Sequence, residues 1–188
     1  MSRQYWEELI AWATADGVAV ANSAAETILI PNVTLPANYM ADGRRALVTA
    51  SGRWSNVVTA VPTLIFRLRW GGVAGVLLAQ SPAIVTPATA TTNAIWELEL
   101  RIQTRVNGAT GSLFVMGRVV MFEDAAATFG TVTNYGLAQP MASAGAATPA
   151  AVTVDLTADT ALSLTAQWSA ANAANTLQAH LWDLESSN

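Results

Sequence analysis

The sequence predicts an all-β protein, an antiparallel β-sandwich preceded by a short N-terminal helix. From residue 27 onward, apolar residues alternate with polar ones in segments of strand length. Turn signals such as Asp42-Gly43 and Asn107-Gly108 separate those segments. With 188 residues, the chain is long enough for one substantial domain with a short appendage. We expect a helical arm over residues 1–26 and a sandwich domain over residues 27–188.

The first segment, Ser2 to about Ala15, is predicted to be a helix. Its apolar residues recur at helical spacing, and Asp16-Gly17 ends the pattern. Ser2 is a suitable N-cap. Two roles for this helix stay open. It is either a docking arm that contacts a partner through its aromatic residues, or a cover for the core of the sandwich. The aromatic residues in question are Tyr5, Trp6 and Trp12.

Two short strands are expected next, at residues 27–30 and 46–51. A longer strand follows at residues 64–70, where apolar side chains alternate with Ile65, Arg67 and Arg69. Gly71-Gly72 predicts a hairpin, with the returning strand at residues 73–79.

The clearest strand runs from Ile95 to Val106. Its apolar face carries Trp96, Leu98, Leu100 and Ile102, and its polar face carries Glu97, Glu99, Arg101, Gln103 and Arg105. The returning strand covers residues 112–123, and Gly117 within it predicts a bulge or a close backbone approach. Cross-strand ion pairs would explain Glu97 and Glu99, with Arg67 and Arg69 as expected partners. The same polar faces would also suit a subunit contact, in which arginine is enriched.

Two strands close the chain, at residues 162–168 and 176–184. In the second, Leu177, Ala179 and Leu181 alternate with Gln178 and His180, which places His180 on the polar face. Connections rich in Ala, Thr and Pro, at residues 81–94 and 138–151, separate the strands. Long strands with long crossing loops favour a jelly roll over an immunoglobulin-type sandwich.

The charge content is low. Charged residues make up 12% of the chain, about half the ~25% that is usual. Nine arginines, no lysine and 13 acids leave a net charge of −4, which argues against binding to nucleic-acid phosphates. The longest charge-free stretches are broken by Pro, Gln, Asn, Thr and Gly, and residues 1–25 contain three acids. We therefore expect no membrane span and no signal peptide.

Two explanations of this charge content remain open. In the first, much of the surface is buried against further copies of the chain or a larger assembly, because interface cores are depleted in charge. In the second, the surface is a neutral one of Thr, Ser, Asn, Gln and Ala, which the chain has in plenty.

No catalytic constellation is visible in the sequence. His180 is the only histidine, no Gly-x-Ser-x-Gly motif supplies a serine nucleophile, and there is no cysteine. The acidic pairs Glu97/Glu99 and Glu123/Asp124 match neither a glycosidase nor a calcium-loop pattern. We therefore expect no enzyme, no cofactor and no metal.

Trp54 lies in the polar stretch 52–56 and is predicted to be in a loop. There it would either pack against the loop, stack on a sugar ring or anchor an interface. The residues that we regard as interface candidates are Tyr5, Trp6, Trp12, Trp54, Arg67, Arg69, Glu97, Glu99 and Arg101.

Three segments resemble strands of a known family. They are residues 64–72 (LIFRLRWGG), 96–101 (WELELR) and 176–182 (TLQAHLW). Joined by Ala/Thr-rich loops, they look like strands of jelly-roll virion proteins of tailed phages, of the head-decoration (cement) or head-fibre type. The resemblance covers residues 27–186 and rests on pattern, without a diagnostic motif. The N-terminal segment has no match in that pattern.

The resemblance implies a homotrimeric structural protein that binds the major capsid protein, or another virion protein, and stabilises the head. It would be located on the surface of the phage particle after synthesis in the host cytoplasm, and it brings no catalytic residues. An alternative is a receptor- or glycan-binding jelly-roll module of a tail fibre or baseplate, using Trp54 or Tyr135. A glycan depolymerase is a third hypothesis, disfavoured because the acid/base constellation is missing.

Overall fold

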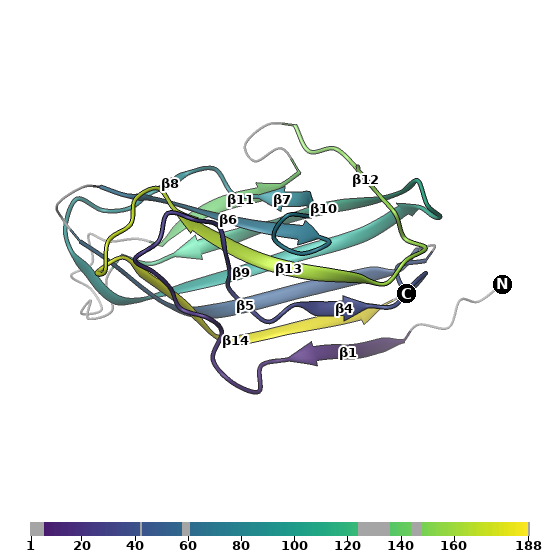
Figure 1. Ribbon diagram of the computed structural model, residues 1–188, viewed down its shortest axis with the longest axis horizontal. Coiled ribbons are helices and arrows are strands. Elements are labelled where there is room, and N and C mark those ends of the chain that lie inside the picture. The colour runs from purple at the N-terminus through teal and green to yellow at the C-terminus, as the bar shows by residue number, and fades with distance from the viewer. Residues whose placement is uncertain (1–5, 42, 58–60, 124–135, 144–147, 188) are drawn as a thin grey trace.

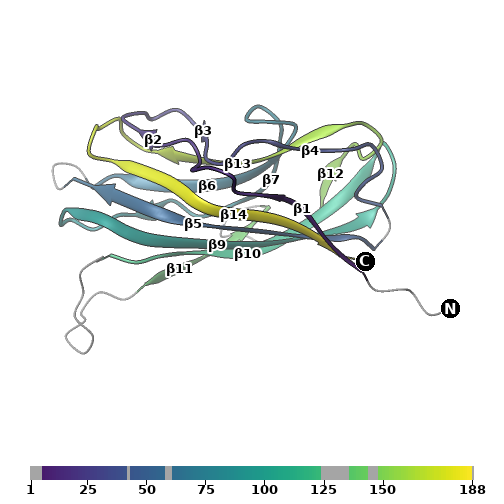
Figure 2. The same cartoon turned by 90° about the horizontal axis from the view of Figure 1, so that it is seen from below.

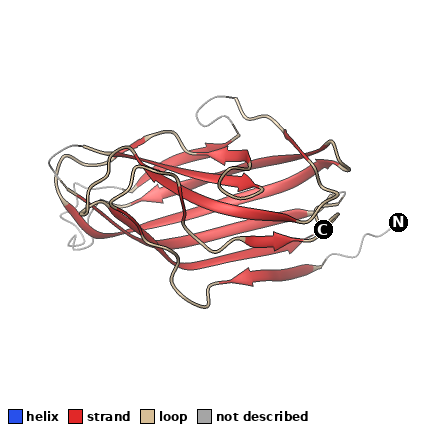
Figure 3. Ribbon diagram, viewed as in Figure 1, coloured by secondary structure: helices blue, strands red, loops and turns tan. Residues whose placement is uncertain are grey.

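The computed structural model of the chain describes residues 6–41, 43–57, 61–123, 136–143 and 148–187. All regular structure in these ranges is β-strand, and every strand pairing is antiparallel (Figure 3). The prediction of an all-β antiparallel protein is therefore confirmed. Within the same ranges, no helix has the length and apolar character needed to cross a membrane.

The strands vary from two to sixteen residues. The first seven are β1 (Glu7–Trp12), β2 (Val20–Ala21), β3 (Thr27–Ile28), β4 (Val33–Leu35), β5 (Arg45–Asn56), β6 (Thr63–Trp70) and β7 (Val76–Gln80). The others are β8 (Ile84–Val85), β9 (Thr91–Val106), β10 (Gly111–Met121), β11 (Leu137–Ala142), β12 (Val152–Val154), β13 (Thr160–Trp168) and β14 (Thr176–Ser187).

The strands form one sheet that folds over into two layers (Figures 1 and 2). The sheet order is β1-β14-β5-β9-β10-β11-β7-β6-β13-β3, with β2, β4, β8 and β12 attached at the side. The first layer runs from β1 to β11, and the second contains β7, β6, β13 and β3. Between β11 and β7 the register contains the pair Ala142↔Gln80 alone, so the two layers are joined there by a narrow connection.

The core lies between the layers and is built by period-two alternation. Along β5, β6 and β9, nearly every second side chain is buried, as alternation predicts. Phe66 of β6 meets Trp96 of β9 across the core, with ring centroids 5.3 Å apart. Three fully buried tryptophans satisfy their indole N–H groups on backbone carbonyls: Trp54 on Phe122 at 3.0 Å, Trp96 on Gln178 at 3.1 Å and Trp168 on Val20 at 3.1 Å.

The predicted N-terminal helix is wrong for the described part of the segment. Residues 7–12 form β1, which pairs with β14 from Glu7↔Ser187 to Trp12↔Asp183. A helix of about fourteen residues is marginal in water without tertiary support. Strand β14 offers an otherwise unpaired edge, whose N–H and C=O groups β1 satisfies. Tertiary pairing therefore overrides the helical spacing of the apolar residues.

Two local features of the long strands can be compared with the predictions. The close backbone approach at Gly117 is confirmed, because a Cβ atom there would lie 1.9 Å from the carbonyl oxygen of Glu99. In β14, the register shifts between Ala179 and Leu181. This bulge turns Leu181 to the outside, where 68% of it is exposed, so the predicted alternation breaks at that residue.

Candidate functional site: the two outer faces of the sandwich

The outward side of the second layer carries a partly buried polar cluster. Its centre is Glu26, just before β3, with Arg67 and Arg69 of β6 and Thr165 and Gln167 of β13 around it. The side chains of Glu26, Arg67 and Arg69 are only 13–18% exposed. We call this surface the closed face, because its charged groups form ion pairs with one another.

Glu26 accepts hydrogen bonds from three side chains of the closed face. Arg69 binds it in a bidentate manner, Nε to Oε1 at 2.6 Å and Nη2 to Oε2 at 2.8 Å. Arg67 Nη1 donates to Oε2 at 3.3 Å, and the Thr165 hydroxyl donates to Oε1 at 2.5 Å. Arg67 also donates to Gln167 Oε1 at 2.8 Å. Glu26 therefore ties the segment before β3 to both β13 and β6.

The pKa of Glu26 reflects this environment. Burial by itself would raise the pKa of the carboxyl group, but the hydrogen bonds from Arg69 and Thr165 and the positive charges of both arginines act in the opposite direction. Together they lower the pKa of Glu26 below its ordinary value. The same ion pair raises the pKa of Arg69. The glutamate is accordingly held in its charged form.

The expected ion pairs of Arg67 and Arg69 with Glu97 and Glu99 are not formed. Strand β6 lies in the second layer and β9 in the first, so their polar faces point away from one another, on opposite sides of the sandwich (Figure 2). Glu99 instead pairs with Arg101 at 2.9 Å and with Arg118 at 3.5 Å. Both are charges of its own layer.

The outward side of the first layer, over β1, β14, β5, β9 and β10, is the open face. Residues directly opposite one another in a sheet share a face, so the register defines rows of side chains across it. The register gives three such rows. They are Glu7–Ser187–Arg45–Gln103–Phe114, Leu9–Glu185–Leu47–Arg101–Met116 and Trp12–Asp183–Thr49–Glu99–Arg118.

Large apolar side chains are exposed on the open face. Their exposed fractions are 51% for Leu9, 55% for Trp12, 48% for Met116 and 68% for Leu181. The charged groups near them are also solvated, with 79% of the Arg101 side chain and 65% of the Arg118 side chain exposed. Exposed apolar residues interspersed with arginine are typical of surfaces that bind other proteins.

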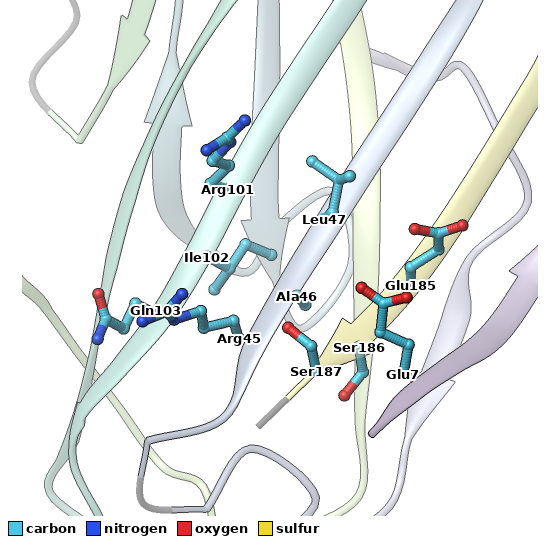
Figure 4. A pocket seen from close by; sticks show the side chains of 10 residues that line it. All are labelled: Glu7, Arg45, Ala46, Leu47, Arg101, Ile102, Gln103, Glu185, Ser186 and Ser187. Carbon is cyan, nitrogen blue, oxygen red and sulfur yellow. The ribbon is translucent and has the colours of Figure 1, made fainter. Parts of the chain in front are cut away.

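Two shallow grooves run along the open face. The larger has a volume of about 450 Å³, and Figure 4 shows Glu7 and Glu185 on its β1/β14 side and Arg45 and Arg101 on its β5/β9 side. The smaller has about 380 Å³ and lies beside Glu99, Arg118 and Leu181. Acids and arginines therefore line opposite sides of the larger groove.

The interface candidates fall in different places. Trp12, Glu97, Glu99 and Arg101 lie on the open face. Trp6 is half-buried, and the guanidinium of Arg44 lies 4.8 Å from its ring centroid. Arg67 and Arg69 belong to the closed face. Tyr5, and Tyr135 of the alternative hypothesis, lie outside the described residues.

The prediction that Trp54 lies in a loop is wrong. Trp54 is part of β5, is 1% exposed, and donates its indole N–H to the carbonyl of Phe122. Arg53 and Ser55 on either side of it lie on the outward face of β5, and Asn56 is buried, so the polar stretch follows the alternation of a strand. A ring buried in this way cannot stack on a sugar or anchor an interface.

The one histidine of the chain lies on β14 beside an acid. His180 Nδ1 lies 3.0 Å from the Asp16 carboxylate, and its side chain is 37% exposed. Across the described ranges, no group of three or more His, Cys, Asp or Glu residues could hold a metal ion. The arrangement provides charges, apolar side chains and shallow grooves on one broad surface.

Glu26, the centre of the closed face, is not among the predicted site residues. A signal was present, because Glu26 is the only charged residue between Asp16 and Asp42. An isolated acid in a charge-free stretch needs a partner if it is to be buried. Its arginine partners lie about forty residues away and Thr165 lies further still, which the local pattern does not reveal.

Comparison with known proteins gives no match: no family model, no curated protein and no solved structure matches the chain.

Proposed function

We propose that the chain is a virion structural protein of a tailed phage, a head-decoration protein that associates with itself and with coat subunits. The observation that carries the proposal is the contrast between the two outer faces. The charged groups of the closed face are partly buried and paired with one another. Beside solvated charges, the open face exposes apolar side chains, namely Leu9, Trp12, Met116 and Leu181. In a chain with only 12% charged residues, such a face favours the first of the two explanations, burial in an assembly.

The virion assignment is supported by the resemblance of three strands, now parts of β6, β9 and β14, to those of phage decoration proteins. In this proposal the chain is a homotrimer that binds the major capsid protein. It reaches the particle surface after synthesis in the host cytoplasm, and it performs no catalytic step.

We propose, in addition, that the sandwich is a jelly roll with added strands. A jelly roll interleaves its eight strands, B to I, as sheets B-I-D-G and C-H-E-F. In support, the order β1-β14-β5-β9 corresponds to B-I-D-G, and the order β3-β13-β6-β7 corresponds to C-H-E-F. Strands β10 and β11 then extend the first sheet. On this assignment β1 is the first strand of the roll.

The mechanism of such a protein is additive burial. Each copy contributes a moderate interface to its neighbours and to the coat, and the symmetry of the head multiplies that contribution. Rigidity of the free copy reduces the entropy lost on binding. The Glu26 cluster and the continuous sheet supply this rigidity in our proposal.

The test has two steps. The mass of the purified chain is measured by light scattering, and the chain is then mixed with heads that lack it and sedimented. We expect a trimer that sediments with heads and saturates at a fixed ratio to coat subunits. A chain that stays in the supernatant at every ratio would overturn the assignment.

A further inference from the structure

The open face divides into two strips of opposite charge. The acidic strip consists of the outward acids of β1 and β14, namely Glu7, Asp183 and Glu185. The basic strip consists of the outward arginines of β5, β9 and β10 that lie in the three rows, namely Arg45, Arg101 and Arg118. Glu99 lies within the basic strip, but its carboxylate is already paired with two of these arginines. Glu97 lies one row further along β9.

One row shows how the two strips are related. From β1 to β10 its residues are Leu9, Glu185, Leu47, Arg101 and Met116. An apolar side chain stands at each end of the row, and the three inner positions hold an acid, a leucine and an arginine in turn. The acid belongs to the β1/β14 half and the arginine to the β9/β10 half, so the two halves are opposite in charge and each carries an exposed apolar residue.

We infer that a second copy of this chain covers the open face, with the acidic strip of one copy on the basic strip of the next. This contact would bury Leu9 and Met116, which are about half exposed in the single chain. It would also give Arg101, whose side chain is 79% exposed, a second acidic partner. Charge complementarity of this kind fixes the register of an interface and suppresses wrong contacts.

The positions of the charges favour a head-to-tail contact over a two-fold one. A two-fold axis running along β5 would pair Glu185 with Arg101, but it would also bring Arg45 against Arg45 and Asp183 against Glu99. In a head-to-tail contact each copy offers its acidic strip and receives another with its basic strip. A head-to-tail contact whose rotation closes forms a ring, and a ring of three is the trimer of the proposed function, on which this inference rests.

Charge reversal tests the inference. Glu185→Arg and Arg101→Glu each place like charges across the contact, and the combined variant restores an attractive pair with reversed polarity. We expect each single reversal to raise the concentration of half-dissociation at least about tenfold, and the double reversal to recover most of that loss. The readout is the mass of the full chain by light scattering over a dilution series, with circular dichroism to confirm folding.

Glu123→Arg is the matched control, because it makes the same change of charge at a described site outside both strips, and its mass is expected to stay unchanged. Single reversals that keep the mass of the unmodified chain would overturn the inference. A dimer that the reversals dissociate would overturn the head-to-tail arrangement.

Sedimentation with heads separates this inference from the proposed function. Reversals that abolish the trimer support the interface whether or not heads are bound. Conversely, a trimer that persists in every reversal variant and still binds heads would contradict the inferred interface but not the proposed function.

Discussion

The closed and open faces are made from similar residues and differ in what those residues contact. Both carry arginines on the outward sides of strands, paired with a glutamate. On the closed face, Glu26 joins Arg67 and Arg69 at 2.6–3.3 Å, and the groups are at most 18% exposed. On the open face, Glu99 meets Arg101 and Arg118 at 2.9–3.5 Å, but both arginines remain more than 60% exposed. Ion pairs of comparable length therefore differ in their surroundings.

This difference determines what each face contributes. A partly buried, bidentate pair holds two segments together, because either partner alone would be left poorly solvated. An exposed pair contributes little to stability, since water screens it and competes for its hydrogen bonds. We conclude that the closed face serves the fold, whereas Arg101 and Arg118 of the open face stay in contact with water.

Among substitutions on the two outer faces, the largest expected effect is that of removing the centre of the closed face. Glu26→Ala leaves Arg67 and Arg69 without their carboxylate, and we expect it to lower the free energy of unfolding by about 2–4 kcal/mol. Urea denaturation measures this. Glu97→Ala, on the open face, is the matched control and should change stability by no more than about 0.5 kcal/mol. Equal losses in the two variants would abolish the distinction between the faces.

A second substitution tests how closely β9 and β10 of the first layer approach one another at Gly117. At Gly117, a methyl group would collide with the carbonyl oxygen of Glu99, 1.9 Å away. Gly117→Ala should therefore separate β10 from β9 and cost about 1–3 kcal/mol in the free energy of unfolding. Thermal denaturation gives the value, with the exposed Val106→Ala as control. An unchanged melting temperature would show that the two strands can move apart freely.

The contribution of the closed face to stability should depend on pH through the ionisation of Glu26. Because the folded-state pKa of Glu26 is lowered, its ion pairs stabilise the native state above the ordinary pKa of 4.5, and that contribution is lost as the pH falls through the lower folded value. The unmodified chain should thus exceed Glu26→Gln in stability at pH 7, and the gap should narrow below about pH 4.5. A gap independent of pH between 7 and 3 would argue against a charged Glu26.

The smallest expected effect on stability is at the edge of the open face. Trp12 is 55% exposed, so Trp12→Ala should change the free energy of unfolding by at most about 0.5 kcal/mol. Trp96→Ala, at a fully buried position, should cost about 3–5 kcal/mol. Trp12→Ala should nevertheless weaken self-association in dilution experiments. Loss of folding in this variant would assign Trp12 to the core instead.

Local sequence patterns predicted most of the long strands well, because their alternation reflects one buried and one exposed side, but they assigned the end of β5 around Trp54 to a loop. The strands near Phe66, Leu98, Val115, Leu164 and Leu177 all lie where the pattern placed them. The N-terminal segment was assigned wrongly, since its apolar residues fit a helix and only the edge of β14 decides for a strand. The Glu26 cluster and the two charged strips depend on which strands become neighbours, and that information is not local.

The pairing of β1 with β14 also affects how the chain folds during synthesis. Strand β1 is made early, and its partner edge follows only after residue 175. At about 5–20 residues per second, the delay is on the order of 10–30 s. During that interval Leu9 and Trp12 belong to a strand without a sheet, and such a strand is a target for aggregation and for chaperones. If the open face binds a second copy, its acidic strip is complete only once β14 has formed. Assembly through this strip therefore follows the folding of the chain.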